Sequence, residues 1–217
     1  MELSEAGALL DPRPLPLETG VQRLHSGQLL VAARSDMHHC TGAMFEWWFR
    51  FAPDTQKYLW WHPIDHISSD WRDTNPQTHI GSMHVITERF GGGPAQDLLV
   101  RFVDPAELFG AEAVAAAGER GDVSAIVFGY AGFAARGTDE QGRPHGVRLL
   151  HVARDTPWGM VLRTRFWMGV DGPEPVPEEI GLALMQHSGT EWHYLSRFLP
   201  SLYIAENRDR IPVALPW

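Results

Sequence analysis

Apolar residues in the middle of the chain fall into short runs of strand length, separated by clusters of Gly, Pro and Asp. In one run the side chains of His84, Ile86 and Glu88 would share a face of an extended chain, because successive side chains point to opposite sides. Runs of this kind, bounded by turn residues, predict β-strands. We predict strands at 28–33, 79–90, 98–103, 123–134, 146–153 and 160–170. We also expect 57–61 to be extended, 68–76 to be a polar loop, and 110–121 to be a short helix or a loop.

The segment 41–51 has the period of a helix. Met44, Trp47, Trp48 and Phe51 are spaced as i, i+3, i+4 and i+7, which places them on one face. Thr41 precedes them and is a good N-cap residue. We therefore predict a helix here, with a strand as the alternative because aromatic residues favour sheets.

A second helix is predicted near the end of the chain. Pro177 suits the first helical position, and two glutamates after it suit the positive end of the helix dipole. The helix should end near Leu199, because the residue before a proline disfavours the helical conformation. Its period predicts one buried face, made of Ile180, Leu184, His187, Glu191, Tyr194 and Phe198.

Several antiparallel strands followed by one long helix predict an α+β fold, with the helix lying across a curved sheet and a pocket between them. Residues 1–27 have little periodicity, so we expect an N-terminal arm, followed by a single domain over 28–217.

The composition narrows the classes of function. The chain of 217 residues has a net charge of −9, which argues against nucleic acid as a partner because such binding needs clustered Lys and Arg. We expect no signal peptide and no membrane span, and the single cysteine, Cys40, suits the cytoplasm. The 11 histidines and 9 tryptophans are unusual, and histidine is the commonest metal ligand.

His187 and Glu191 are the first candidates for metal ligands. They stand four residues apart in the middle of the predicted buried face, so both side chains can reach one ion. An ionised carboxylate in an apolar groove is costly unless a cation or a basic partner compensates it. The spacing alone leaves both the metal and a basic partner open.

Two more ligands would complete the site. Glu88 lies on a predicted strand, on a face that can point toward the pocket. His66, His62, His79 and His84 are rivals for the last position, and nothing local separates them. Two histidines with two carboxylates suit Zn²⁺ or another divalent first-row ion.

Four segments of the chain form a combination that is fairly specific. They are Met44-Phe-Glu-Trp-Trp-Phe49, Tyr58-Leu-Trp-Trp-His-Pro-Ile-Asp-His66, Gly81-Ser-Met-His-Val-Ile-Thr-Glu88 and His187-Ser-Gly-Thr-Glu191. Together these segments resemble a known family, the 2,4-diacetylphloroglucinol hydrolases and phloretin hydrolases, and they occur in the family's order between about Met44 and Tyr203.

The resemblance implies a Bet v 1-like helix-grip fold and a zinc enzyme that hydrolyses the carbon–carbon bond between an acyl group and a phenolic ring. It implies that the zinc ligands are His66, Glu88, His187 and Glu191, and it selects His66 over His62. It also places Tyr58 near an oxygen of the substrate, and we assign catalytic roles to Tyr58, Glu88 and Glu191. Ser69 departs from the family, where an Asn stands soon after the first histidine ligand.

The expected substrate is a small acylated phenol or a related aromatic ketone, and the resemblance implies a homodimer. Two other functions stay open. One is a metal-free helix-grip protein that carries or senses a hydrophobic ligand. The other is a zinc enzyme of the same fold that acts as a lyase, cyclase or ester hydrolase on a related polyketide, since one fold hosts many reactions.

Overall fold

The computed structural model describes residues 1–172 and 175–210 and contains an eight-stranded sheet in the order β1-β2-β8-β7-β6-β5-β4-β3. All neighbouring strands are antiparallel. The strands are β1 (Gly20–Arg23), β2 (Leu29–His38), β3 (His66–Arg72), β4 (Met83–Glu88), β5 (Gln96–Val103), β6 (Ala125–Phe133), β7 (Val147–Thr156) and β8 (Gly159–Met168). The helices are η1 (Leu3–Leu10), α1 (Gly42–Phe51), α2 (Thr55–Trp61), α3 (Ala106–Phe109), α4 (Ala111–Glu119), η2 (Ala134–Arg136) and α5 (Glu178–Asn207).

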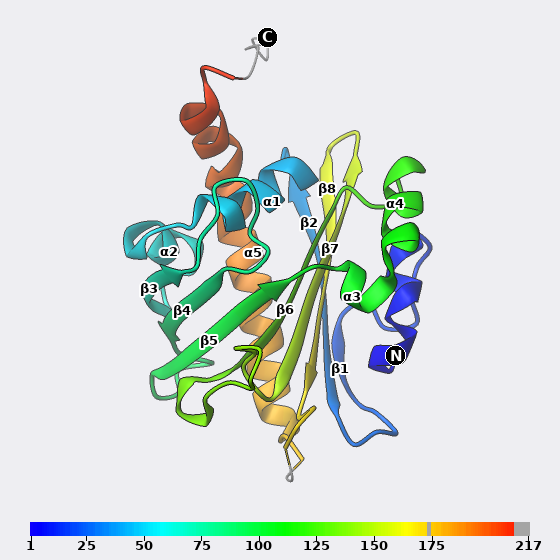
Figure 1. Cartoon of the computed structure of the whole chain (residues 1–217), viewed down its shortest axis with the longest axis vertical. Coiled ribbons are helices and arrows are strands. Elements are labelled where there is room, and N and C mark those ends of the chain that lie inside the picture. Colours follow the sequence, from blue (N-terminus) through cyan, green and yellow to red (C-terminus); the bar gives the residue numbers. More distant parts are fainter. Residues whose placement is uncertain (173–174, 211–217) are drawn as a thin grey trace.

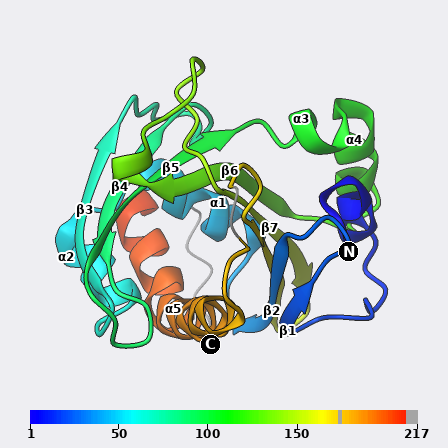
Figure 2. The same ribbon diagram turned by 90° about the horizontal axis from the view of Figure 1, so that it is seen from below.

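The sheet curves around α5, and this arrangement is the expected α+β helix-grip fold (Figure 1). The short helices η1, α3 and α4 lie on the opposite side of the sheet (Figure 2). Among the described residues, no helix is both long and apolar enough to cross a membrane.

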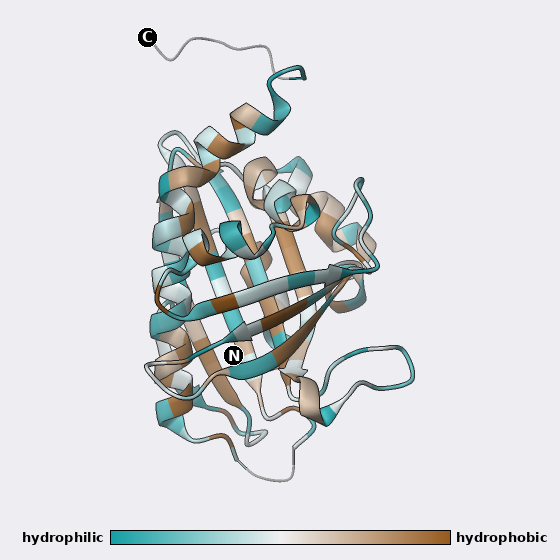
Figure 3. Cartoon of the chain, turned by 90° about the vertical axis from the view of Figure 1, so that its left-hand side faces the viewer, coloured by the Kyte–Doolittle hydropathy of each residue, from teal (hydrophilic) through white to brown (hydrophobic). Residues whose placement is uncertain are grey.

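The alternation of side chains along the strands produces two separate cores. Leu149 belongs to the core between the sheet and α5, whereas the next residue, Leu150, belongs to the core under η1 and α4. Phe102 and Val103 divide in the same way. Both faces of the sheet thus carry apolar side chains, and Figure 3 shows hydrophobic stretches of its strands in brown. The candidate site lies within the first of these two cores.

The helix α1 forms as its period predicts. The Thr41 side chain accepts a hydrogen bond from the Met44 backbone N–H at 3.3 Å, so it is the N-cap. Trp47 and Trp48 are buried, and Phe51 is partly buried against the same core.

The helix α5 is longer than predicted, because it continues through Pro200 to Asn207. A proline inside a helix removes the hydrogen bond to the carbonyl four residues earlier, which here is that of Ser196. The Cys40 thiol lies 3.9 Å from this carbonyl oxygen and donates to it. The freed acceptor is thus satisfied from another part of the fold, and the last turns of α5 project beyond the body of the domain (Figure 1).

The buried face of α5 is also rotated from the predicted one. Ile180 is exposed, and the neighbouring Gly181 packs against β2 instead. His187 and Glu191 remain on the buried side, as expected. The other buried residues of the helix are Gly181, Ser188, Trp192, Leu195 and Leu199.

Two local predictions were wrong. Residues 57–61, expected to be extended, belong to the helix α2, because Asp54 caps it by accepting a hydrogen bond from the Lys57 N–H at 2.9 Å. Residues 68–72, expected to be in a loop, belong to β3. Among the described strands β3 lies at an edge of the sheet and pairs with β4. Asp70 and Arg72 are exposed, so the strand lacks the apolar run by which a strand is predicted.

The N-terminal segment, where we expected an arm, contains regular structure. Its first part forms η1, where Ala6, Leu9 and Leu10 are buried against the outer face of the sheet. Its last part contains β1, which pairs with β2.

Candidate metal centre

Two strands and one helix deliver the four predicted ligands to one place. His66 opens β3 and Glu88 closes β4, and the antiparallel register sets these two residues opposite each other. A register shift between His66 and Ser68 follows directly. His187 and Glu191 lie one turn apart on the buried side of α5.

The nitrogen and oxygen atoms of these side chains converge. His66 Nε2 lies 3.6 Å from Glu88 Oε2 and 3.7 Å from Glu191 Oε2. His187 Nε2 lies 3.7 Å from Glu88 Oε2 and 3.9 Å from Glu191 Oε2. All four residues are buried. The ligand atoms of His66, His187 and Glu191 all lie within 4.8 Å of one another.

Hydrogen bonds fix the orientation of both imidazole rings. His66 Nδ1 lies 2.9 Å from the Tyr58 carbonyl oxygen, and His187 Nδ1 lies 3.1 Å from Asp65 Oδ2. Since both acceptors lack hydrogens, each histidine carries its proton on Nδ1 and turns an unprotonated Nε2 toward the centre. His66 Nε2 is buried and has no hydrogen-bonding partner in the described part of the chain. A buried nitrogen with a free lone pair is suited to bind a metal ion.

Burial removes the charges that these groups would carry in water. It raises the pKa of Glu88 to about 7, against the opposing effect of the Tyr58 hydrogen bond. Burial, and then the charge of Glu88, hold the pKa of Glu191 well above its ordinary range. Burial lowers the pKa of His66 to about 2 and that of His187 to about 4. The imidazoles are therefore neutral, and a divalent cation would supply the positive charge that favours ionised carboxylates at this buried place.

Tyr58 joins this cluster from α2. Its hydroxyl donates a hydrogen bond to Glu88 Oε2 at 2.6 Å, and its ring stacks on His66 with 3.7 Å between the ring centres. Burial, followed by the charge of Glu88, raises the pKa of Tyr58 well above its ordinary value. Tyr58 is thus a protonated group next to a site carboxylate.

The rival histidines lie elsewhere in the core. His84 Nε2 lies 2.8 Å from the Ser69 hydroxyl oxygen, and His79 lies against Phe49 and Phe102. His62 is close to the cluster and stacks on His187, but its Nδ1 accepts the Asp65 backbone N–H.

Asp65 is the residue that the sequence analysis missed. Its carboxylate contacts His187 although 122 positions separate the two residues. Its position directly before His66 was the available signal, but adjacency in sequence does not say where a side chain points.

Aromatic rings surround the cluster. Trp61 packs edge-on against both Tyr58 and His66, and Phe90 lies 5.1 Å from His187 between ring centres. Trp47, Trp48 and Trp61 are buried, whereas Trp60 is exposed.

The fold and the cluster together define a helix-grip protein with a buried centre of two histidines and two glutamates. The family described as DAPG hydrolase PhiG domain matches residues 1–204, so the chain belongs to this family and is a hydrolase. This confirms the resemblance noted from the sequence motifs.

Two relatives and one solved structure show the extent of the similarity. A 2,4-diacetylphloroglucinol hydrolase of Pseudomonas protegens is 24% identical over 93% of this chain and 72% of its own. A phloretin hydrolase of Eubacterium ramulus is 28% identical over 84% of this chain and 70% of its own. The protein NE0264 of Nitrosomonas europaea has a TM-score of 0.50 at 10% identity, covers 84% of this chain and 99% of its own, and shows the fold alone.

Proposed function

We propose that this protein is a zinc-dependent hydrolase that cleaves the bond between an acyl carbon and a phenolic ring. Two relatives are named for hydrolysis of 2,4-diacetylphloroglucinol and of phloretin, which supports this class of substrate. The observation that carries the proposal is the convergence of His66, Glu88, His187 and Glu191 inside the core.

The residues present fit a zinc ion. Neutral imidazole nitrogens and carboxylate oxygens are ligands that Zn²⁺ accepts, and other divalent first-row ions accept them too. The buried and unpartnered His66 Nε2, with two carboxylates in reach, gives such an ion both a lone pair and charge balance. When bound, the ion would supply Lewis-acid activation of the ketone and of water.

The reaction consumes one water molecule. The water oxygen joins the acyl carbon, the bond from that carbon to the ring breaks, and the products are a carboxylic acid and a ring that carries a hydrogen instead. The ring carbon must receive a proton before it can leave, because an aryl carbanion is a poor leaving group.

The Tyr58–Glu88 pair supplies the means to hold and move this proton. Tyr58 keeps its hydroxyl proton because its pKa is raised, and its hydrogen bond to Glu88 orients it toward the centre. The Glu88 carboxylate accepts this hydrogen bond, so a proton can pass between the two side chains. We assign proton handling at the substrate to these two residues.

The aromatic shell favours a flat substrate. Trp61 and Trp192 contact each other within the core, and both belong to the layer between α5 and the sheet. Aromatic faces of this kind bind aromatic ligands well. The two buried carboxylates speak against a metal-free carrier of apolar ligands, because a purely apolar cavity gains nothing from them.

Metal analysis combined with an activity assay tests the proposal. The purified wild type should contain one zinc or similar ion per chain and should release a carboxylic acid from acylated phloroglucinols. His187→Ala and Glu191→Ala should lose both the metal and the activity, whereas the exposed His193→Ala should keep both. A wild type without a stoichiometric metal, or variants that keep it, would overturn the assignment.

A further inference from the structure

Asp65 lies between two histidines on the turn that joins α2 to β3, and its side chain is buried. Its Oδ2 atom lies 3.1 Å from His187 Nδ1 and 3.6 Å from His62 Nε2. The candidate metal centre described above uses neither Asp65 nor His62 as a ligand.

The backbone of Asp65 is held as firmly as its carboxylate. Its N–H donates to His62 Nδ1 at 3.0 Å, and its carbonyl accepts the Arg89 N–H at 2.9 Å. Arg89 directly follows Glu88, and Asp65 directly precedes His66. Asp65 is therefore next in sequence to the ligand from β3, hydrogen-bonded to the residue after the ligand from β4, and hydrogen-bonded to the ligand from α5.

A carboxylate at hydrogen-bonding distance from an imidazole nitrogen can only accept a proton from it. Because a neutral imidazole has one N–H, the proton of His187 then stays on Nδ1 and the lone pair of Nε2 stays free. We propose that Asp65 is a positioning residue that holds His187 in this tautomer and orientation for the metal. This inference rests on the proposed function, in which His187 Nε2 is a ligand.

His62 completes the arrangement. Its ring lies parallel to that of His187, with 4.5 Å between the ring centres and 14° between the planes, so His187 cannot turn toward that side. The ligand atoms of His62, Asp65 and His187 also lie within 4.8 Å of one another, which makes a second cation the alternative occupant. The contact between His187 and Asp65 favours the positioning role, because an Nδ1 that donates its proton to Asp65 has no lone pair for a second cation.

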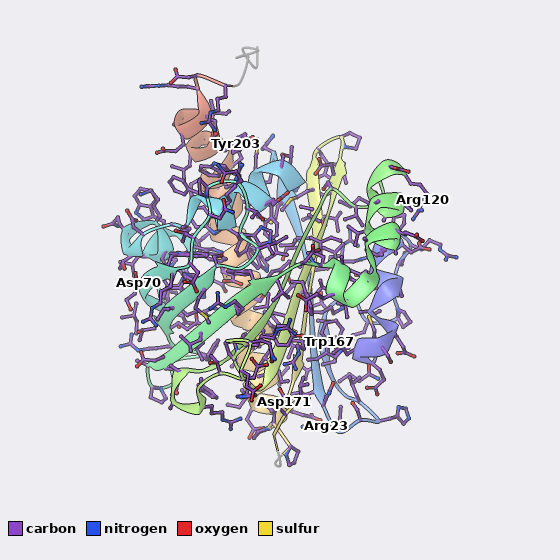
Figure 4. All side chains as sticks on the ribbon, viewed as in Figure 1. Arg23, Asp70, Arg120, Trp167, Asp171 and Tyr203 are labelled. Atoms are coloured by element: carbon purple, nitrogen blue, oxygen red, sulfur yellow. The ribbon has the colours of Figure 1, made fainter. Side chains whose placement is uncertain are left out.

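Nitrogen-15 NMR of the histidine rings tests the tautomer in metal-free protein. In the wild type, His187 should be protonated on Nδ1. Asp65→Asn should retain this tautomer, since its amide oxygen still accepts, and Asp65→Ala should lose it. Asp70→Asn is the matched control, because Asp70 is an exposed residue on the outer edge of the same part of the fold (Figure 4).

Zinc affinity, measured by competition with a coloured chelator, gives the second readout. Loss of such a partner typically weakens metal binding by about 10- to 100-fold, so we expect this loss for Asp65→Ala and a smaller one for Asp65→Asn. Circular dichroism must show that each variant is folded.

Three results separate the alternatives. An unchanged tautomer and unchanged affinity in Asp65→Ala would overturn the positioning role. Two zinc ions per wild-type chain, with one lost in Asp65→Asn, would replace it with a second metal site. A wild type that binds no zinc would overturn the proposed function, whereas the NMR comparison would still decide whether Asp65 sets the tautomer of His187.

Discussion

Neutralising Glu88 should stabilise the metal-free protein while it weakens metal binding. Burial raises the pKa of this carboxyl from 4.5 to about 7, so the folded metal-free protein holds its proton more tightly than the unfolded chain does. Stability from this group is complete below pH 4.5 and is lost as the pH rises to about 7. At pH 8 the loss amounts to about 3 kcal/mol, because one pKa unit corresponds to about 1.4 kcal/mol.

Glu88→Gln removes this loss, and its amide oxygen can still accept the Tyr58 hydrogen bond. We expect the variant, treated with a chelator, to unfold in urea with a free energy about 3 kcal/mol above that of the wild type at pH 8. The difference should shrink toward zero at pH 5, and zinc affinity should fall at both pH values.

The exposed Glu46→Gln is the control, since surface substitutions usually change stability by less than about 0.5 kcal/mol. Equal or lower stability of metal-free Glu88→Gln at pH 8, or a difference that does not depend on pH, would refute the reasoning.

Three further predictions concern catalysis, acid stability and packing. Tyr58→Phe should lower kcat by about 10²- to 10⁴-fold with unchanged zinc content, as measured by single-turnover assays, and full activity would contradict its role in proton handling. Burial lowers the pKa of His151 to about 3, so the contribution of this residue to the free energy of unfolding should fall as the pH drops below 6.5, by about 2 kcal/mol at pH 5. His151→Gln should lessen this fall in urea titrations. An equal fall in the wild type and the variant would contradict the role of His151. Gly181→Ala should lower the melting temperature, because the new methyl group would lie 2.7 Å from Leu29 Cδ2. Gly189→Ala should raise the melting temperature, because the space around Gly189 is open and alanine has a higher helix propensity than glycine. If both glycine variants changed the melting temperature in the same direction, packing at Gly181 would not be the deciding effect.

The sequence by itself determined the features that depend on local geometry. The helical spacing of Trp47 and Trp48 behind Thr41 predicted α1 and its cap. The spacing of His187 and Glu191 placed both on the buried side of α5, because residues four apart lie one turn apart on any helix. The apolar runs predicted most of the strands, and family motifs then implied which distant residues meet.

The tertiary structure decided what depends on neighbours from elsewhere in the chain. The register of β3 against β4 brings His66 opposite Glu88, whereas the local sequence pattern did not separate the four candidate histidines. Pro200 lies inside α5, and Cys40, from another part of the chain, donates to the carbonyl that the proline frees. The contact between Asp65 and His187 exists only because α5 packs into the curved sheet. Spacing fixes direction along one helix or strand, but only the packing of these elements determines which side chains meet.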